Sequence, residues 1–324
     1  MAIRNPHLAK LKAGYLFPEI NKRKQAFLAS SPGAKLISLG IGDTTEPLCP
    51  TIIKGLHERV EALKAKETYT GYGPEQGEKA IRERISSCFY NGKRSADEIF
   101  ISDGSKCDIG RLQILFGKDH TISVQDPSYP VYVDTSLIMG QNAIQYLSCT
   151  PENGFFPDLE KAKPTSLFYF CSPNNPTGAV ATKNQLKKLV DFCKNNRTVL
   201  IYDNAYAAYI QDKRLPKSIF EIDGAEEVAI ELGSFSKIAG FTGVRLAYSV
   251  VPKALKYDDG SDIHKDWARI NSTFFNGASN IAQTRALFAL SDEGLLEVEK
   301  QIAYYLENAR ILKNTFTELK YEVY

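Results

Sequence analysis

The chain has 324 residues, of which 43% are hydrophobic and 24% charged, enough for a sizeable core and too apolar for a disordered protein. Its 40 lysine and arginine residues nearly balance 38 aspartate and glutamate residues, so neither a nucleic-acid surface nor a polybasic membrane anchor is expected. No apolar run approaches the roughly 20 residues that span a bilayer, and the first residues lack the pattern of a secretory signal.

Cysteine and histidine usage argues against a disulfide framework and against a metal centre. The six cysteines include no CxxC pair, so we expect reduced thiols in a cytoplasmic protein. The four histidines are scattered outside the segments singled out below, which disfavours histidine-based acid–base or metal chemistry.

Short apolar segments and amphipathic segments alternate from about residue 97 onward. The predicted elements are, in chain order, a strand at 98–104, a helix at 107–117, strands at 121–130 and 166–178, a helix at 183–196, and strands at 198–206 and 228–237. Such alternation favours a largely parallel sheet with helices on both faces.

The last segment is predicted to be one long helix at 292–320. Residues 321–324, Tyr-Glu-Val-Tyr, have the pattern of a strand that has no sheet to join. We therefore expect the chain to end inside a domain.

Polar residues follow the carboxyl ends of the predicted strands, where open α/β sheets bind their ligands. These clusters lie at 104–106, 129, 174–175, 203–206 and 234–237. Five clusters that converge on one sheet edge predict a ligand site there.

The first cluster has the character of a phosphate site. Gly104, Ser105 and Lys106 open a predicted helix, so backbone N–H groups and the positive end of the helix dipole face outward. Groups that can complete such a site are Ser234, Ser236 and Arg245. An ordinary helix cap with surface charges is the alternative interpretation.

A second group of side chains suits a heteroaromatic ring. Asp203 ends an apolar strand, where a carboxylate needs a partner, and a protonated ring nitrogen is one. Tyr206 and Asn175 offer a phenol and an amide to a ring oxygen, and Tyr129 can stack on the ring. The alternatives are a helix N-cap for Asp203, core packing for the tyrosines and a plain turn at 173–178.

Lys237 completes the pattern, since it follows two serines after an apolar run and precedes Arg245 by eight residues. A phosphate site, an acid for a ring nitrogen, donors for a ring oxygen and a desolvated lysine together match pyridoxal 5′-phosphate (PLP). The aldehyde of PLP forms a Schiff base with a lysine. A surface lysine is the alternative.

The motif order resembles the PLP-dependent aminotransferases of fold type I. The motifs are GSK, DPSYP, SPNNPTG, DNAY, SFSK and the arginine eight residues beyond the lysine. The resemblance implies a three-layer α/β fold around a mostly parallel seven-stranded sheet, plus a smaller α+β domain that is incomplete here. It implies an N-terminal arm and part of the small domain at 1–45, a PLP-binding domain at 46–291, and a linking helix with the start of the small domain at 292–324. It makes Lys237, Asp203 and Tyr206 the catalytic residues.

Further stretches are similar to the LL-diaminopimelate aminotransferases. They lie at 4–20, 39–48, 70–77, 215–222 and 274–283. The resemblance implies transamination between LL-diaminopimelate or tetrahydrodipicolinate and glutamate or 2-oxoglutarate, in lysine and cell-wall diaminopimelate synthesis. It also implies a cytoplasmic homodimer with shared active sites and, past residue 324, an arginine for the substrate α-carboxylate.

The same resemblance implies the substrate-binding residues. Glu75 is expected to pair with the distal ammonium of the substrate, and Lys106 to reach a carboxylate or the cofactor phosphate. Tyr72 would reach the cofactor phosphate of the neighbouring subunit. The other positions implied to touch substrate are Tyr15, Gly42, Tyr129, Asn175 and Asn276, the last also near the cofactor. The alternatives are a solvated carboxylate for Glu75, packing of the arm for Tyr15, a turn glycine for Gly42 and a turn cap for Asn276.

Two other functions stay open from the sequence. An aminotransferase for aspartate or an aromatic amino acid would carry the same motifs. A shortened, catalytically silent PLP-binding dimer would retain them as well.

Overall fold

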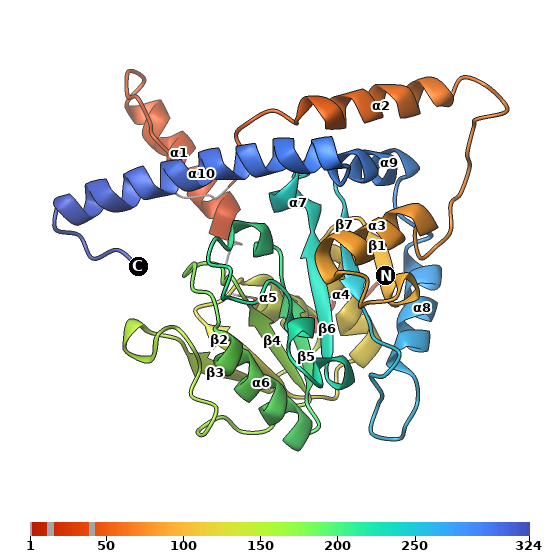
Figure 1. Ribbon diagram of the computed structural model, residues 1–324. Coiled ribbons are helices and arrows are strands. Elements are labelled where there is room, and N and C mark those ends of the chain that lie inside the picture. The colour runs from red at the N-terminus through yellow and green to blue at the C-terminus, as the bar shows by residue number, and fades with distance from the viewer. Residues whose placement is uncertain (1, 12–15, 39–42) are drawn as a thin grey trace.

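A seven-stranded sheet forms the centre of the computed structural model, which describes residues 2–11, 16–38 and 43–324 (Figure 1). The strand order is β1-β7-β6-β5-β4-β2-β3. The strands are β1 (Ile99–Ser102), β2 (Ile122–Asp126), β3 (Ile144–Ser148), β4 (Leu167–Cys171), β5 (Val199–Asp203), β6 (Ala229–Ser234) and β7 (Ala247–Val250). Only β7 runs antiparallel to its neighbours, β1 and β6, in this described sheet. The predicted mostly parallel seven-stranded sheet is confirmed.

Helices cover both faces of this sheet. They are α1 (Leu16–Ser30), α2 (Pro50–Ala62), α3 (Lys79–Tyr90), α4 (Ser105–Phe116), α5 (Val131–Met139), α6 (Lys183–Asn195), α7 (Phe235–Ile238), α8 (Ile263–Phe274), α9 (Asn280–Ala289) and α10 (Asp292–Glu318). The short 3-10 helices used below are η2 (Ala96–Glu98), η4 (Ala207–Tyr209) and η5 (Ile219–Glu221).

The alternation of side chains along the strands separates the two faces. In β4, Tyr169 and Cys171 point into the core shared with α4, α5 and α8, whereas Phe168 and Phe170 point toward α6. The strand is apolar at every position because both of its faces are covered, as is usual for parallel strands. The sequence prediction of three layers is therefore confirmed.

The local sequence explains how α6 is held on its face. Thr182 caps the helix by accepting a hydrogen bond from the Gln185 backbone, and Gln185 bonds back to the Thr182 backbone. The buried side chains of the helix recur at helical spacing: Leu186, Leu189, Val190 and Cys193. Burying each leucine contributes roughly 1.5–3 kcal/mol.

At the sheet end from which α7 emerges, α2, α9 and α10 pack on one another (Figure 1). The Tyr305 hydroxyl of α10 accepts hydrogen bonds from the backbones of Thr45 and Glu46, so α10 holds the segment that leads into α2. Residues 321–324, expected to start a strand, form no regular element. No sheet was expected for this segment to join, and a strand is stabilised only by pairing with another strand.

The buried carboxylate of Glu231 connects three segments of the chain by hydrogen bonds. Glu231 of β6 is fully buried and accepts hydrogen bonds from the Tyr90 hydroxyl (2.7 Å), the Asn204 amide (2.9 Å), and the Ser218 hydroxyl (2.7 Å) and Ile219 backbone (2.9 Å). These donors lie at the end of α3, just after β5 and at the start of η5. Because Asn204 follows Asp203, this network also fixes the end of β5.

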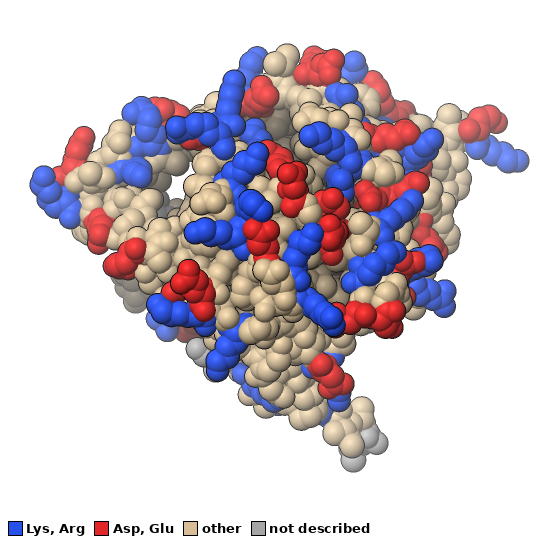
Figure 2. All heavy atoms as spheres, turned by 60° about the horizontal axis from the view of Figure 1, so that its bottom comes forward, with Lys and Arg blue, Asp and Glu red and all other residues tan. Residues whose placement is uncertain are grey.

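Charges of both signs alternate over the face shown in Figure 2, and neither sign dominates there. Among the described helices, none combines the length and apolar character needed to cross a membrane.

Candidate active site

The carboxyl ends of β4, β5 and β6 bring the predicted site residues to one edge. The register pairs Asp203 with Cys171 of β4 and with Leu232 of β6, and Ser234 ends β6 two residues later. Because these three strands are parallel and adjacent, the polar residues that follow them lie around one space.

Asp203 is a buried carboxylate that accepts hydrogen bonds from neutral donors. Its side chain accepts hydrogen bonds from the Tyr132 hydroxyl (2.6 Å) and the Ala205 backbone (3.2 Å), and the residue is 5% exposed. Burial raises the pKa of Asp203, while these two hydrogen bonds lower it.

Lys237 lies on the short helix α7, which Ser234 caps by accepting a hydrogen bond from the Ser236 backbone (3.1 Å). Its Nζ atom is 5.8 Å from the centre of the Tyr206 ring, and the Tyr209 hydroxyl donates to its backbone carbonyl (3.2 Å). Burial lowers the pKa of Lys237, and the charge of Asp43 partly opposes that shift. The amine is therefore neutral more often than a surface lysine.

Two tyrosines flank the space between Asp203 and Lys237. Burial, with smaller effects from Cys171, Asp203 and Tyr129, raises the pKa of Tyr206 to about 12. Tyr206 is thus a neutral phenol at physiological pH and can donate a hydrogen bond. Tyr129 packs edge-on against Tyr132, with ring centres 5.8 Å apart, and the Lys106 Nζ lies 5.6 Å from its ring centre.

Arg245 closes over the amino end of α4, where Ser105 is the first helical residue. Gly104 caps that helix at φ 138°, and a Cβ atom there would lie 2.2 Å from Nη2 of Arg245. Arg245 Nη1 donates to the Ser236 hydroxyl (3.4 Å) and the Thr242 carbonyl (3.1 Å). A guanidinium, two serines and a helix amino end thus meet in one place, an arrangement suited to a phosphate.

Asn175 lies in the turn after β4, which its neighbour Asn174 holds. The Asn174 amide donates to the Pro127 carbonyl (3.2 Å) and the Thr177 hydroxyl (3.0 Å). Because Pro127 precedes Tyr129 by two residues, this bond ties the turn of Asn175 to the loop of Tyr129.

Asn276 and Glu75 come from two loops that touch each other. A Cβ atom on Gly277 would lie 3.2 Å from the Pro74 carbonyl oxygen and 3.6 Å from the Glu75 Cα atom. The loop of Asn276 also contacts α4, because the Arg111 guanidinium lies 4.0 Å from the Phe275 ring centre.

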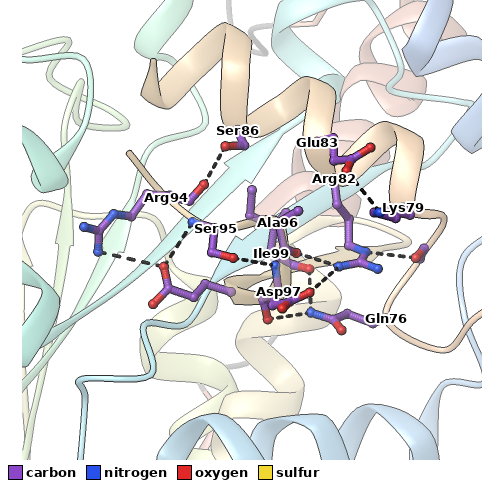
Figure 3. A network of polar contacts seen from close by, with 12 residues as sticks. Gln76, Lys79, Arg82, Glu83, Ser86, Arg94, Ser95, Ala96, Asp97 and Ile99 are labelled. Carbon is purple, nitrogen blue, oxygen red and sulfur yellow. Dashed lines mark hydrogen bonds and ion pairs between the residues drawn. The ribbon is translucent and has the colours of Figure 1, made fainter. Parts of the chain in front are cut away.

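The loop of Glu75 is anchored to the sheet by the network in Figure 3. Gln76 donates to the carbonyls of Asp97 (2.8 Å) and Ile99 (3.0 Å), and Arg82 donates to those of Gly77 (3.0 Å) and Ala96 (2.6 Å). Glu75 itself is exposed, and Tyr72 is 91% exposed.

The structure therefore joins most of the predicted residues, but not all of them. Lys237, Tyr206, Asp203 and Tyr129 share one space, and Gly104, Ser236 and Arg245 share the phosphate-like corner beside it. Tyr15 and Gly42 lie outside the described residues.

Several residues of the site were not predicted from the sequence. They are Asp43, Arg111, Tyr132, Tyr209 and Thr242. The only sequence signal for Tyr132 was its place three residues after Tyr129, at the start of a helix that the local pattern did not predict. The partners of the others are distant along the chain.

This fold and this arrangement of side chains define a class I and II aminotransferase. The family model described as "Aminotransferase class I and II" matches residues 34–324.

Comparison with individual proteins identifies the family within this class. An LL-diaminopimelate aminotransferase from Protochlamydia amoebophila is 54% identical over all of this chain and 82% of its own length, and a chloroplastic one from Arabidopsis thaliana is 54% identical over 99% and 72%. The solved L,L-diaminopimelate aminotransferase of Chlamydomonas reinhardtii is 56% identical with a TM-score of 0.96, over all of this chain and 82% of that one. The chain belongs to the LL-diaminopimelate aminotransferase family.

Proposed function

We propose that the chain binds PLP and transfers an amino group between LL-diaminopimelate or tetrahydrodipicolinate and glutamate or 2-oxoglutarate. One observation carries the proposal: a desolvated lysine, a buried carboxylate that accepts hydrogen bonds from neutral donors, and a guanidinium closing on a helix amino end surround one space. The names of the relatives support the substrate.

The residues present fit PLP at both of its ends. Asp203 is buried among neutral groups, so a protonated pyridine nitrogen supplies the positive charge that the described neighbours lack. At the other end, Arg245, Ser236 and the start of α4 suit the phosphate. Tyr206 and Asn175 would hold the ring oxygen between them.

When bound, PLP supplies a ring that accepts the electrons left on the substrate α-carbon. The side chains of this chain perform the proton transfers. Lys237 removes the α-proton as a general base and later returns a proton, and its lowered pKa favours the neutral amine needed for the first step. Asp203 keeps the ring nitrogen protonated, and Tyr206 donates to the ring oxygen.

The substrate class follows from charge. LL-diaminopimelate carries an ammonium and a carboxylate at its far end, so its site needs charges of both signs. Glu75 would pair with the distal ammonium, and Lys106, beside Tyr129, would reach a carboxylate. Asn276 would contact substrate from the loop packed on Pro74.

We also propose a cytoplasmic homodimer in which Tyr72 of one copy reaches the cofactor phosphate of the other. The exposure of Tyr72, 91%, on a loop whose far end is anchored to the sheet supports this assembly. A large aromatic side chain of that exposure is more stable when a second chain covers it.

The test is the absorption spectrum of the purified chain with PLP, before and after addition of LL-diaminopimelate, for the wild type and for Lys237→Ala. We expect a spectral change with the substrate in the wild type, and loss of turnover by at least about a thousandfold in the variant. The exposed Lys213→Ala is the matched control. Turnover of aspartate without turnover of diaminopimelate would contradict the substrate, and an active Lys237→Ala variant would contradict the mechanism.

A further inference from the structure

A buried tyrosine outside the proposed catalytic set contacts Asp203 directly. The Tyr132 hydroxyl donates to Asp203 Oδ2 at 2.6 Å, across 71 residues of sequence. Tyr132 is fully buried and Asp203 is 5% exposed, so water does not compete for this hydrogen bond.

The ring of Tyr132 is held so that its hydroxyl has one position. It stacks on Tyr169 with ring centres 5.2 Å apart and an interplanar angle of 16°. The Tyr169 hydroxyl in turn accepts a hydrogen bond from Gln113 (2.8 Å), a fully buried residue of α4. The helix that starts at the phosphate corner therefore fixes the ring that contacts Asp203.

All groups that face Asp203 in the described chain are neutral donors or neutral acids. They are the Tyr132 hydroxyl on α5, the Cys171 thiol on β4, the Tyr206 phenol and the Ala205 backbone N–H. Burial raises the pKa of the Cys171 thiol and of the Tyr206 phenol, so both stay uncharged at physiological pH. The Tyr132 hydroxyl donates a shorter hydrogen bond to the carboxylate (2.6 Å) than the Ala205 backbone does (3.2 Å).

We propose that Tyr132 is a positioning residue for the reaction: its hydroxyl keeps Asp203 ionised and turned toward the cofactor ring nitrogen. The inference rests on the proposed function, because it gives Asp203 that partner. Without this hydroxyl, burial favours the protonated carboxylic acid, which cannot hold a protonated ring nitrogen.

The first test compares the dissociation constant for PLP, measured by equilibrium dialysis at pH 7.5, in Tyr132→Phe and Tyr169→Phe. Both variants remove one hydroxyl from a fully buried ring of the same stack, but only Tyr132 contacts Asp203. We expect about tenfold weaker binding in Tyr132→Phe, since a hydrogen bond to a charged group is lost, and less than about twofold in Tyr169→Phe. Equal effects of the two variants would overturn the inference.

The variant Asp203→Asn separates this inference from the proposed function. We expect it to weaken PLP binding and to make a further Tyr132→Phe change nearly silent, because the hydroxyl then has no carboxylate to hold ionised. If Asp203→Asn binds PLP like the wild type, the cofactor site itself is wrong. If it binds weakly while Tyr132→Phe adds its full effect, only the role of Tyr132 is wrong.

The second readout is the pH dependence of urea unfolding of the cofactor-free chain. A carboxyl group whose folded-state pKa is raised contributes stability below its unfolded pKa, and this stability is lost as the pH rises through the folded pKa. Tyr132→Phe raises the folded pKa further, so its deficit relative to the wild type grows as the pH rises above the ordinary pKa of an aspartate. The Tyr169→Phe deficit stays constant. A Tyr132→Phe deficit independent of pH would overturn the inference even where cofactor binding is affected.

Discussion

Lys237 and Asp203 are ionisable residues that the fold removes from water. Burial lowers the pKa of the lysine and raises that of the aspartate, so in both cases it favours the neutral form. A cofactor that bonds covalently to the amine and brings a protonated nitrogen to the carboxylate relieves both unfavourable states. The pKa shifts of Lys237 and Asp203 are therefore those expected of a site that binds a ligand.

Replacing Lys237 by glutamine should stabilise the cofactor-free chain at neutral pH. A lysine whose folded pKa is lowered binds fewer protons in the folded state, so the wild type gains stability as the pH rises from that pKa to the unfolded value near 10.4. We expect Lys237→Gln to exceed the wild type in free energy of unfolding at pH 7, with the difference shrinking toward pH 10.

Urea unfolding at both pH values measures this difference, and Lys213→Gln, at an exposed position, is the control. The prediction is contradicted if Lys237→Gln is less stable than the wild type at pH 7. The packing of the lysine side chain would then stabilise the fold by more than the burial of its charge destabilises it.

At the scale of elements, α4 links the phosphate corner to the core. Its amino end meets Arg245 at Gly104, and farther along the helix Gln113 supports the stacked tyrosines. Between them, Arg111 bonds to Asp103 (2.8 Å) and Asp108 (3.1 Å) and contacts Phe275. One helix therefore supports both the phosphate-like corner and the stacked tyrosines beside Asp203.

Replacement by alanine is predicted to have opposite effects at two glycines of this region. Gly104→Ala puts a methyl group 2.2 Å from Arg245 at φ 138°, so Arg245 must move and PLP binding should weaken about tenfold. Gly110→Ala, inside α4 with no atom within 4 Å of the new methyl, should raise the free energy of unfolding by about 0.5–1 kcal/mol and leave PLP binding unchanged. Urea unfolding and equilibrium dialysis of both variants test this pair, and comparable PLP binding by the two would contradict it.

Glu231 links β6 to α3, η5 and the turn after β5. Glu231→Ala leaves buried donors on Tyr90, Ser218 and Asn204 without their acceptor, so we expect the free energy of unfolding to fall by about 3 kcal/mol or more. The exposed Glu227, paired with Lys194, is the control, and its replacement by alanine should change stability by less than about 0.5 kcal/mol. Equal losses of unfolding free energy in the two variants would show that the buried network does not stabilise the fold.

At the scale of the whole molecule, the described chain forms one sheet with its site at one edge, while Tyr72 projects outward. The proposed dimer would place Tyr72 of each copy in the site of the other. The division into an arm at 1–45, a central domain at 46–291 and a carboxyl-terminal part at 292–324 stays a prediction.

Mixed dimers of two inactive variants test the shared site. If Lys237→Ala and Tyr72→Ala subunits exchange at random, half of the dimers are mixed and each has one intact site, so activity should return to about a quarter of the wild-type value. The measurement is the transamination rate after unfolding and refolding the variants together. Activity that stays at the level of the separate variants would mean that Tyr72 acts within its own subunit or not at all.

The residues proposed to bind PLP could be singled out in the sequence because each stands beside a local signal. Asp203 and Lys237 follow apolar runs, and Gly104 and Ser105 precede a helix, so their strands and the helix over 105–116 were predicted nearly in place. The predicted parallel strands also placed these residues at one edge of the sheet, since the carboxyl ends of parallel strands lie at the same edge. The antiparallel strand β7, between β1 and β6, was not predicted from the local pattern.

The partners of those residues were decided by the tertiary structure. Tyr132 lies 71 residues from Asp203, and Asp43 acts on Lys237 from the other end of the chain. Such contacts depend on strand order and helix packing, which set the distances between segments that the backbone does not join locally. The proposed catalytic groups could therefore be singled out along the chain, whereas their ionisation depends on burial and neighbours that only the folded chain brings together.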